Sequence, residues 1–501
     1  MENPVGRPML PSFMPQRTGW YVALLALVLA FGFLGSRGIW DPDEGRYTNV
    51  AMNMLASGDW LTPMRNHETG HWTKPPLTYW AIASSVGALG ATPWAARLPV
   101  ALSYLACVLL AWLIARRLVP GREAEAAIVY ATMGFTALAS NLLTTDYLLA
   151  ATETAAVWAF VEVRFGKPER PLRWVVLMWF FFGLAFLTKG PPALLPLLAL
   201  LVFDRLVPGQ AVRLFRLPAL AVFAAVALPW YAAVALRNPG LLEYLLAHEV
   251  VNRVATDRFD RNGEWYGWLY VYAPVLLLGT LPWTRALFGA VRAGGARIPI
   301  WFRDRDARTR DSGWLLLLVW IVLPLLVFCI ARSRMPLYLL PLFVPLALLV
   351  AMQLQATRRS LPAMHWLLLW VVLLLAFKFG TSIWTTHKDA SGWADAVRQR
   401  MTQPAEEFLF VDDMPRFGLH LELGYPVQIE RLSLEDSPAD AFMSGLDGSL
   451  QSELQECKMD RRLWITKEQN WAAVAARIEA LGYTTRVVGE PYRQRVMFEV
   501  F

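Results

Sequence analysis

Charged residues are scarce in this sequence. Asp, Glu, Lys and Arg make up 17% of its 501 residues, whereas soluble globular domains carry about 25%. Hydrophobic residues make up 56%, and the mean hydropathy is +0.37. This composition excludes an ordinary soluble domain and indicates an integral membrane protein.

Cysteine is nearly absent, with three copies in the whole chain. Cys107 and Cys329 lie inside apolar runs, and Cys457 lies alone in a polar region. Three isolated cysteines cannot form a disulfide framework, and none has the spacing of a metal or redox motif.

The basic excess is small and is divided among short loops. The chain carries 47 Lys and Arg against 40 Asp and Glu, and most of the difference lies between apolar runs, as expected for a membrane protein. We therefore expect a lipid bilayer and no nucleic acid as a partner. The first apolar run is not followed by a small-residue cleavage site, so we expect it to be retained as a helix.

About eleven apolar runs are candidate membrane spans, with a helix of roughly 20 residues needed to cross. They cover residues 20–39, 98–115, 126–143, 147–163, 174–187, 192–203, 217–236, 266–291, 314–330, 336–352 and 364–379. Arginine-rich loops alternate with loops that carry acids, and the arginine side is expected to be cytoplasmic. This alternation requires residues 76–90 to form a juxtamembrane helix at the interface.

The chain changes character near residue 385. Short runs at 408–411, 427–429, 463–465, 486–488 and 496–498 predict strands, and residues 471–481 predict a helix that ends before Gly482. We expect a membrane domain over residues 1–384, whose first loop outside the cytoplasm is 40–97, and a small α/β domain over residues 385–501 that also lies outside the cytoplasm.

The loops on the acidic side hold most of the chemically useful side chains. Carboxylates suit a general base or the orientation of an acceptor, and Lys and Arg suit a phosphate group. Together they predict a reaction on a lipid-linked phosphate at the membrane surface. The members of this set are Asp41, Asp43, Glu44, Arg46, Lys74, Asp146, Lys189, His248, Glu249, Arg253, Arg332, Arg334 and Tyr338. The plainer interpretation is that single arginines, Arg37, Arg65 and Arg97 above all, only reach from the interface into water.

Two other patterns have competing interpretations. His67-Glu68-Thr69-Gly70-His71 matches the H-E-x-x-H motif of zinc peptidases, which needs a helix. Gly70 inside the motif and Pro63, Pro75 and Pro76 around it disfavour that helix. Asp412, Asp413, His420 and Glu422 follow a predicted strand, and we expect a structural or docking role for them.

These segments resemble the GT-C membrane glycosyltransferases, especially the lipid A aminoarabinose transferases and their protein O-mannosyltransferase-like relatives. The matching segments, in family order, are residues 43–47, 55–60, 74–80, 97–99, 146, 183–190, 248–253 and 334–341. The resemblance implies a mainly α GT-C fold, a bacterial inner-membrane location and a periplasmic active site. It further implies inverting transfer of a sugar from an undecaprenyl-phosphate-linked donor to lipid A, a glycan or a protein.

The resemblance also implies roles for individual residues. Asp43 and Asp146 correspond to the catalytic acids, and Glu44, His248 and Glu249 are possible supports. The residues implied to bind the donor phosphate or lipid are Lys74, Arg46, Tyr47, Arg253, Arg334, Tyr338 and Lys189. Relatives usually carry Glu where this chain has Thr73, so we predict no metal site, although the resemblance leaves a divalent metal open. A transporter or flippase of lipid-linked sugars is the alternative function.

Overall fold

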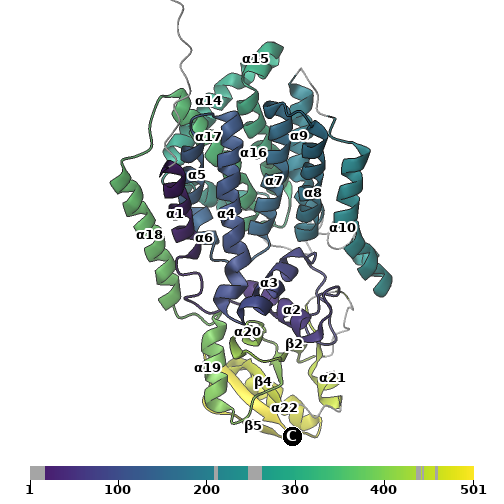
Figure 1. The fold of residues 1–501 in the computed structure, drawn as a ribbon. Helices are drawn as coiled ribbons and strands as arrows, with labels where there is room; N and C mark the ends of the chain where they lie inside the picture. Colours follow the sequence, from purple (N-terminus) through teal and green to yellow (C-terminus); the bar gives the residue numbers. More distant parts are fainter. Residues whose placement is uncertain (1–16, 208–212, 246–261, 436–441, 443–444, 457–460) are drawn as a thin grey trace, which may run out of the picture.

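The computed structural model describes residues 17–207, 213–245, 262–435, 442, 445–456 and 461–501. His248, Glu249 and Arg253 lie outside these residues, so the roles expected for them stay predictions. The described chain forms a helical bundle, and a sheet with its own helices lies beyond one end of it (Figure 1).

Helices that run along the bundle account for most of the chain. In the described residues, six segments are long and apolar enough to cross a membrane: α4, α8, α10, α16, η4 with α17, and α18. The bounds are α1 Arg17–Phe31, α4 Pro93–Leu118, α5 Glu123–Thr132, α6 Gly134–Ala139, α7 Asp146–Gly166, α8 Pro171–Lys189, η1 Pro191–Leu194, α9 Leu195–Leu206, α10 Leu217–Arg237, α11 Leu241–Tyr244, α13 Gly267–Leu278, α14 Thr284–Arg303, α15 Arg305–Arg310, α16 Ser312–Ile330, η4 Pro336–Leu342, α17 Phe343–Ala356 and α18 Met364–Ile383.

Three expected spans differ from the structure. The run 126–143 is divided between α5 and α6, because Met133 adopts an extended backbone conformation. The run 266–291 is divided between α13 and α14, and Pro282, which lacks an N–H group for a helical hydrogen bond, lies in the break. Helix α1 ends at Phe31 instead of Ile39, since Gly32, Gly35 and Gly38 disfavour its continuation.

The loops fall at two opposite ends of the bundle, as the charge alternation predicted. At the end far from the sheet, Arg117 pairs with Glu162 at 2.7 Å, and Arg122 donates to the carbonyl of Arg359 at 3.0 Å. Asp146 and Lys189 meet at the end near the sheet. Which end faces the cytoplasm stays a prediction.

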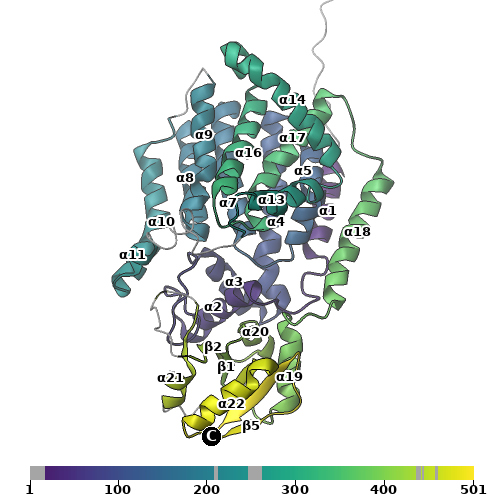
Figure 2. The same ribbon diagram turned by 180° about the vertical axis from the view of Figure 1, so that it is seen from behind.

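Two short helices lie between the bundle and the sheet in both views (Figures 1 and 2). Helix α2 is Asp43–Ser57, and α3 is Leu77–Leu89, which packs along α2. The 13 residues of α3 are too few to cross a bilayer. Helix α2 has two acids in its first turn, which interact favourably with the positive end of the helix dipole. Its C-cap is Gly58, whose φ of 72° is left-handed.

The C-terminal part contains a six-stranded sheet in the order β3-β2-β1-β4-β6-β5. The first four strands in this order are parallel to one another, and β6 is antiparallel to both of its neighbours, β4 and β5. Phe408 and Phe410 of β1 face one apolar core, and Leu409 and Val411 face the other, as the two-residue period of a strand requires. The elements are α19 Ala390–Arg400, β1 Glu407–Val411, α20 Leu419–Leu423, β2 Gln428–Ser433, β3 Gly448–Ser449, α21 Leu450–Gln455, β4 Arg462–Lys467, η5 Glu468–Asn470, α22 Trp471–Ala480, β5 Thr485–Val487 and β6 Arg495–Val500.

Candidate functional site

Three acids of the first loop lie close together in sequence but have very different exposures. The Asp43 side chain is 51% exposed, whereas that of Glu44 is 4% exposed and Asp41 as a residue is 2% exposed. A carboxylate must reach its substrate to act on it. Of these three acids, Asp43 is therefore the one that a substrate can contact.

Glu44 is the centre of a buried ion-pair network. Its carboxylate accepts hydrogen bonds from Arg37 at 2.6 and 2.9 Å and from Arg97 at 2.8 and 3.1 Å. The backbone N–H groups of Trp40 and Leu143 also donate to it, each at 2.9 Å. Burial alone would raise the pKa of Glu44, but the two arginines hold it below its usual range. Glu44 thus joins the start of α2 to α4 and to the loop before α7.

Three arginines are buried, contrary to the expectation from the sequence. Arg37, Arg65 and Arg97 were expected to lie at the interface, yet each is at least 95% buried. Arg65 pairs with Asp447 of the C-terminal part at 2.5 Å. The sequence does not distinguish the two cases for Arg65 and Arg97, because their acidic partners lie far away in the chain. For Arg37, the partner Glu44 is near in sequence, but its burial depends on distant segments.

Asp43, Arg46 and Tyr47 lie on one face of α2, at the spacing of three and four residues that brings helical side chains together. Arg46 forms an ion pair with Asp43. Burial raises the pKa of Tyr47 above its usual value, against the lowering effect of Arg46, and the charges of Asp146 and Asp43 raise it further. Tyr47 therefore stays a neutral hydrogen-bonding group within electrostatic reach of both acids.

Asp146 and Lys189 form the second part of the candidate site. They come from the first turn of α7 and the last turn of α8, and Lys189 Nζ lies 2.5 Å from Asp146 Oδ1. The same ammonium lies 4.2 Å from the centre of the Tyr338 ring, a cation–π contact. Lys189 at the end of α8 thus contacts both the start of α7 and the distant segment η4.

Lys74 lies on the segment before α3. Its Nζ donates to the carbonyl of Thr73 at 2.8 Å, and the Thr73 hydroxyl lies 2.9 Å from Nε2 of His71. The ring of Tyr79 on α3 lies 6.1 Å from the His71 ring and 5.9 Å from the Tyr47 ring. Aromatic contacts therefore link the Lys74 segment to the face of α2 that carries Asp43 and Tyr47.

Arg334 is buried and holds a loop. Its guanidinium donates to the carbonyls of Asn262, Glu264 and Cys329 at 2.6, 2.7 and 2.9 Å. These bonds fix the segment before η4, which carries Tyr338. Direct contact of Arg334 with a phosphate stays a prediction.

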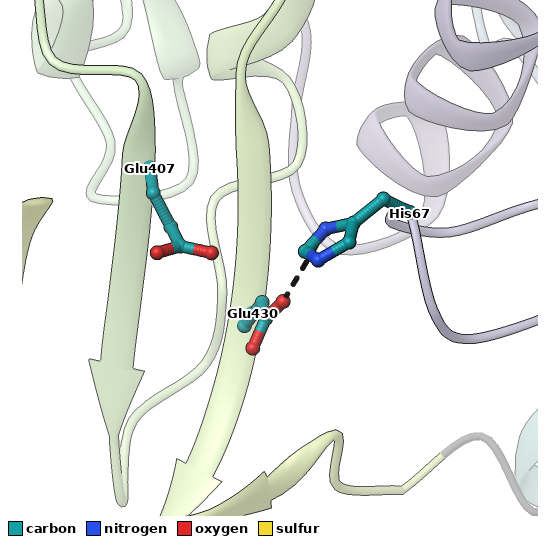
Figure 3. A group of neighbouring side chains, drawn as sticks. All are labelled: His67, Glu407 and Glu430. Atoms are coloured by element: carbon teal, nitrogen blue, oxygen red, sulfur yellow. Dashed lines mark ion pairs between the residues drawn. The ribbon is translucent and has the colours of Figure 1, made fainter. Parts of the chain in front are cut away.

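The H-E-x-x-H pattern does not form a zinc-peptidase site. Residues 67–71 are not helical, so the motif lacks the single helix face that its two histidines need. His71 bonds Thr73, whereas His67 lies against the C-terminal sheet, with its Nδ1 4.0 Å from Glu430 (Figure 3).

His67, Glu407 and Glu430 offer ligand atoms within 4.8 Å of one another. Arg462 already lies 2.8 Å from Glu407 and 3.1 Å from Glu453. This arrangement is typical of an ion-pair network across the sheet, and the absence of a metal site stays a prediction.

Two buried charges within apolar helices were not predicted. Lys378 of α18 donates to Ser140 at 2.9 Å and to Asn141 at 3.1 Å, which fastens α18 to the bundle. Glu153 of α7 is buried two turns beyond Asp146 and within electrostatic reach of Lys189. A lone charged residue inside an apolar run is the signal that could have found both.

The contacts of His420 and Glu422 fit the structural or docking role expected for them, since both reach residues within 39–49. Glu422 accepts from the backbone N–H of Ile39 at 2.8 Å, and His420 Nδ1 lies 2.8 Å from Asn49. Asp413 pairs with Arg495 at 3.0 Å within the C-terminal part, a structural role.

Asp41 makes stability depend on pH. Burial raises its pKa to about 8 from an ordinary value of 3.8. Because the folded protein keeps this proton to a higher pH than the unfolded chain does, the stability present in acid is lost as pH rises through about 8. We expect Asp41→Asn to reduce the fall in melting temperature between about pH 5 and pH 9, as measured by thermal unfolding. The exposed acid in Asp395→Asn is the control, and equal pH slopes for both variants and the wild type would contradict the role of Asp41.

Three comparisons relate the chain to known proteins. Residues 73–236 match the family model described as dolichyl-phosphate-mannose-protein mannosyltransferase. The undecaprenyl phosphate-alpha-4-amino-4-deoxy-L-arabinose arabinosyl transferase 2 of Pseudomonas fluorescens is 34% identical over 344 residues, which cover 66% of this chain and 55% of that protein. The corresponding transferase of Edwardsiella ictaluri is 32% identical over 68% of this chain and 60% of that protein. The chain therefore matches less than two thirds of the length of these relatives.

A solved structure shares the fold almost throughout. ArnT from Cupriavidus metallidurans bound to undecaprenyl phosphate superposes with a TM-score of 0.75 at 21% identity, over 96% of this chain and 98% of that one. The shared fold extends over bundle and sheet.

Proposed function

We propose that this chain, which is similar to membrane glycosyltransferases in sequence and in fold, is a glycosyltransferase of the GT-C type that transfers a sugar from an undecaprenyl-phosphate-linked donor to lipid A. The observation that carries the proposal is the position of Tyr47, which is within reach of both the Asp43–Arg46 pair and the Asp146–Lys189 pair. An exposed acid and the cations proposed to bind the donor phosphate therefore lie at the same end of the bundle.

Each group has a proposed role in the transfer. Asp43 orients the acceptor and takes its proton where the acceptor is a hydroxyl. The acceptor oxygen bonds to the anomeric carbon while the bond to the donor phosphate breaks on the opposite face, so the configuration inverts. Lys74 and Lys189, with Arg46, stabilise the negative charge on the departing undecaprenyl phosphate. Tyr47 and Tyr338 bound the site, and Asp146 holds Lys189 in place.

The proposal also includes an orientation in the cell. The site, loop 40–97 and the unit 385–501 face the periplasm of a bacterial inner membrane, and residues 1–384 cross that membrane about eleven times. The arginine-rich loops at the far end support this orientation, because cytoplasmic loops carry an excess of Lys and Arg.

The test is a transfer assay with purified protein. The protein in detergent is mixed with lipid A and undecaprenyl phosphate-α-4-amino-4-deoxy-L-arabinose, and the product is followed by mass spectrometry. We expect lipid A to gain one aminoarabinose and undecaprenyl phosphate to be released. Aminoarabinose-free lipid A after full incubation would contradict this donor and acceptor.

The same preparation tests the flippase alternative. Reconstituted in vesicles with labelled donor lipid on one side only, a flippase moves the label across without releasing the sugar. We expect sugar release with no accelerated movement of the donor between leaflets. Movement without release would overturn the transferase.

A further inference from the structure

The C-terminal unit contacts α2 on both sides of its first turns. The backbone N–H of Gly418 lies 3.2 and 3.3 Å from the two carboxylate oxygens of Asp41, just before the helix. Two turns further on, His420 Nδ1 lies 2.8 Å from Asn49 Oδ1. The side chains of Asp41, Asn49 and His420 are each at least 90% buried, so water does not compete for these hydrogen bonds.

The contacts use the back and one flank of α2. At 100° per residue, Gly45 lies roughly opposite Asp43 and Tyr47, whereas Asn49 lies on the flank of the helix next to Arg46, three residues earlier in the chain. The C-terminal unit thus holds the helix opposite its exposed acid and beside its arginine.

The start of α2 packs so closely against the C-terminal unit that a side chain at position 45 would not fit. A Cβ at Gly45 would lie 1.8 Å from Asp41 Oδ1 and 2.7 Å from the Gly418 nitrogen. Only glycine permits this approach between α2 and the start of α20. A shift of the C-terminal unit would therefore be transmitted to the first turn of α2.

The bond between His420 and Asn49 has a defined direction. Asn49 donates through Nδ2 to the carbonyl of Arg65 at 2.5 Å, which leaves its Oδ1 as the acceptor from His420 Nδ1. Burial lowers the pKa of His420 to about 4, so the imidazole is neutral and carries its single proton on Nδ1. Nε2 is buried and has no hydrogen-bond partner among the described residues.

We propose that the C-terminal unit positions α2 for sugar transfer and that His420 is a positioning residue, acting through Asn49 on the helix that carries Asp43 and Arg46. This inference rests on the proposed function. A misplacement of about 1 Å at a reacting group can lower a rate about 100-fold, so the contact governs turnover more than binding of the lipid donor. Of the three cations proposed to stabilise the donor phosphate, Lys74 and Lys189 lie outside α2, and Arg46 lies on it.

The test uses variants of His420 in the full-length protein. Asparagine places an amide N–H near the position of Nδ1, glutamine reaches the position of Nε2 instead, and leucine offers no donor. We expect His420→Leu and His420→Gln to lower kcat by about 10- to 100-fold, with a much smaller change in KM for the donor. His420→Asn is expected to restore most of kcat.

Each outcome separates the two proposals. The exposed histidine in His387→Leu is the matched control within the same unit, and it is expected to keep the wild-type kcat. Should His420→Leu fail to fold, as judged by melting temperature and gel filtration, the polar His420→Gln carries the test. Wild-type kcat in the folded Leu or Gln variant, or an Asn variant no faster than the Gln variant, overturns the positioning role. A wild type that transfers no sugar overturns the proposed function instead.

Discussion

Glu44→Ala is expected to destabilise the protein more than any other single change at this end of the bundle, by about 3–5 kcal/mol. The substitution leaves the guanidinium groups of Arg37 and Arg97 buried without their shared carboxylate. It also removes the acceptor of the buried N–H of Leu143 and of the N–H of Trp40. The apparent melting temperature of the detergent-solubilised protein, scanned at one rate, measures the effect.

The control for Glu44→Ala is an acid that also pairs with an arginine but whose side chain is exposed. Glu406 pairs with Arg461 at 2.7 Å on the surface of the C-terminal part, where ion pairs add little to stability. Glu406→Ala is therefore expected to leave the melting temperature nearly unchanged. Equal shifts for the two variants would show that the Glu44 network does not hold the first loop.

Much of the bundle could be predicted because bilayer spans have a strong signal. Long apolar runs and the alternation of arginine loops with acidic loops placed Asp146 and Lys189 at one end. The breaks within 126–143 and 266–291 could not be predicted, because a continuous apolar run is compatible with either one helix or two shorter helices. Five of the six described strands could be predicted, but β3, which is only Gly448–Ser449, was missed because it contains no apolar run. The order of the strands could not be predicted, since it depends on pairing between distant segments.

The sequence indicated which loops carry the candidate site but not which of its acids is accessible. Asp41, Asp43 and Glu44 look equivalent in a linear motif, and their burial is decided by partners far along the chain, Gly418 for Asp41 and Arg97 for Glu44. The resemblance to a family favoured Asp43, and its exposure supplies the physical reason. The sequence predicted a structural or docking role for His420, but it gave no signal that its partner is Asn49 of α2.

Asp43→Asn is expected to lower kcat by about 100- to 10,000-fold, the range for loss of a general base or acid. Asparagine keeps an oxygen acceptor of the same size but removes the charge that pairs with Arg46. The helix should stay folded, because Asp43 is exposed and Glu44 still anchors its first turn. Asp59→Asn, which changes an exposed acid just beyond the other end of α2, is expected to keep the wild-type kcat, and a similar kcat for both variants would remove Asp43 from the chemistry.

The pH dependence of the Asp43→Asn rate separates base catalysis from orientation. A hydroxyl acceptor must lose a proton, so without the carboxylate its transfer rate should rise with pH as hydroxide replaces the base. A phosphate acceptor is already ionised near neutral pH, so loss of Asp43 would then remove only orientation and leave the rate level with pH. Because lipid A offers both phosphates and hydroxyls, the slope of log kcat against pH for this one variant reports which oxygen receives the sugar.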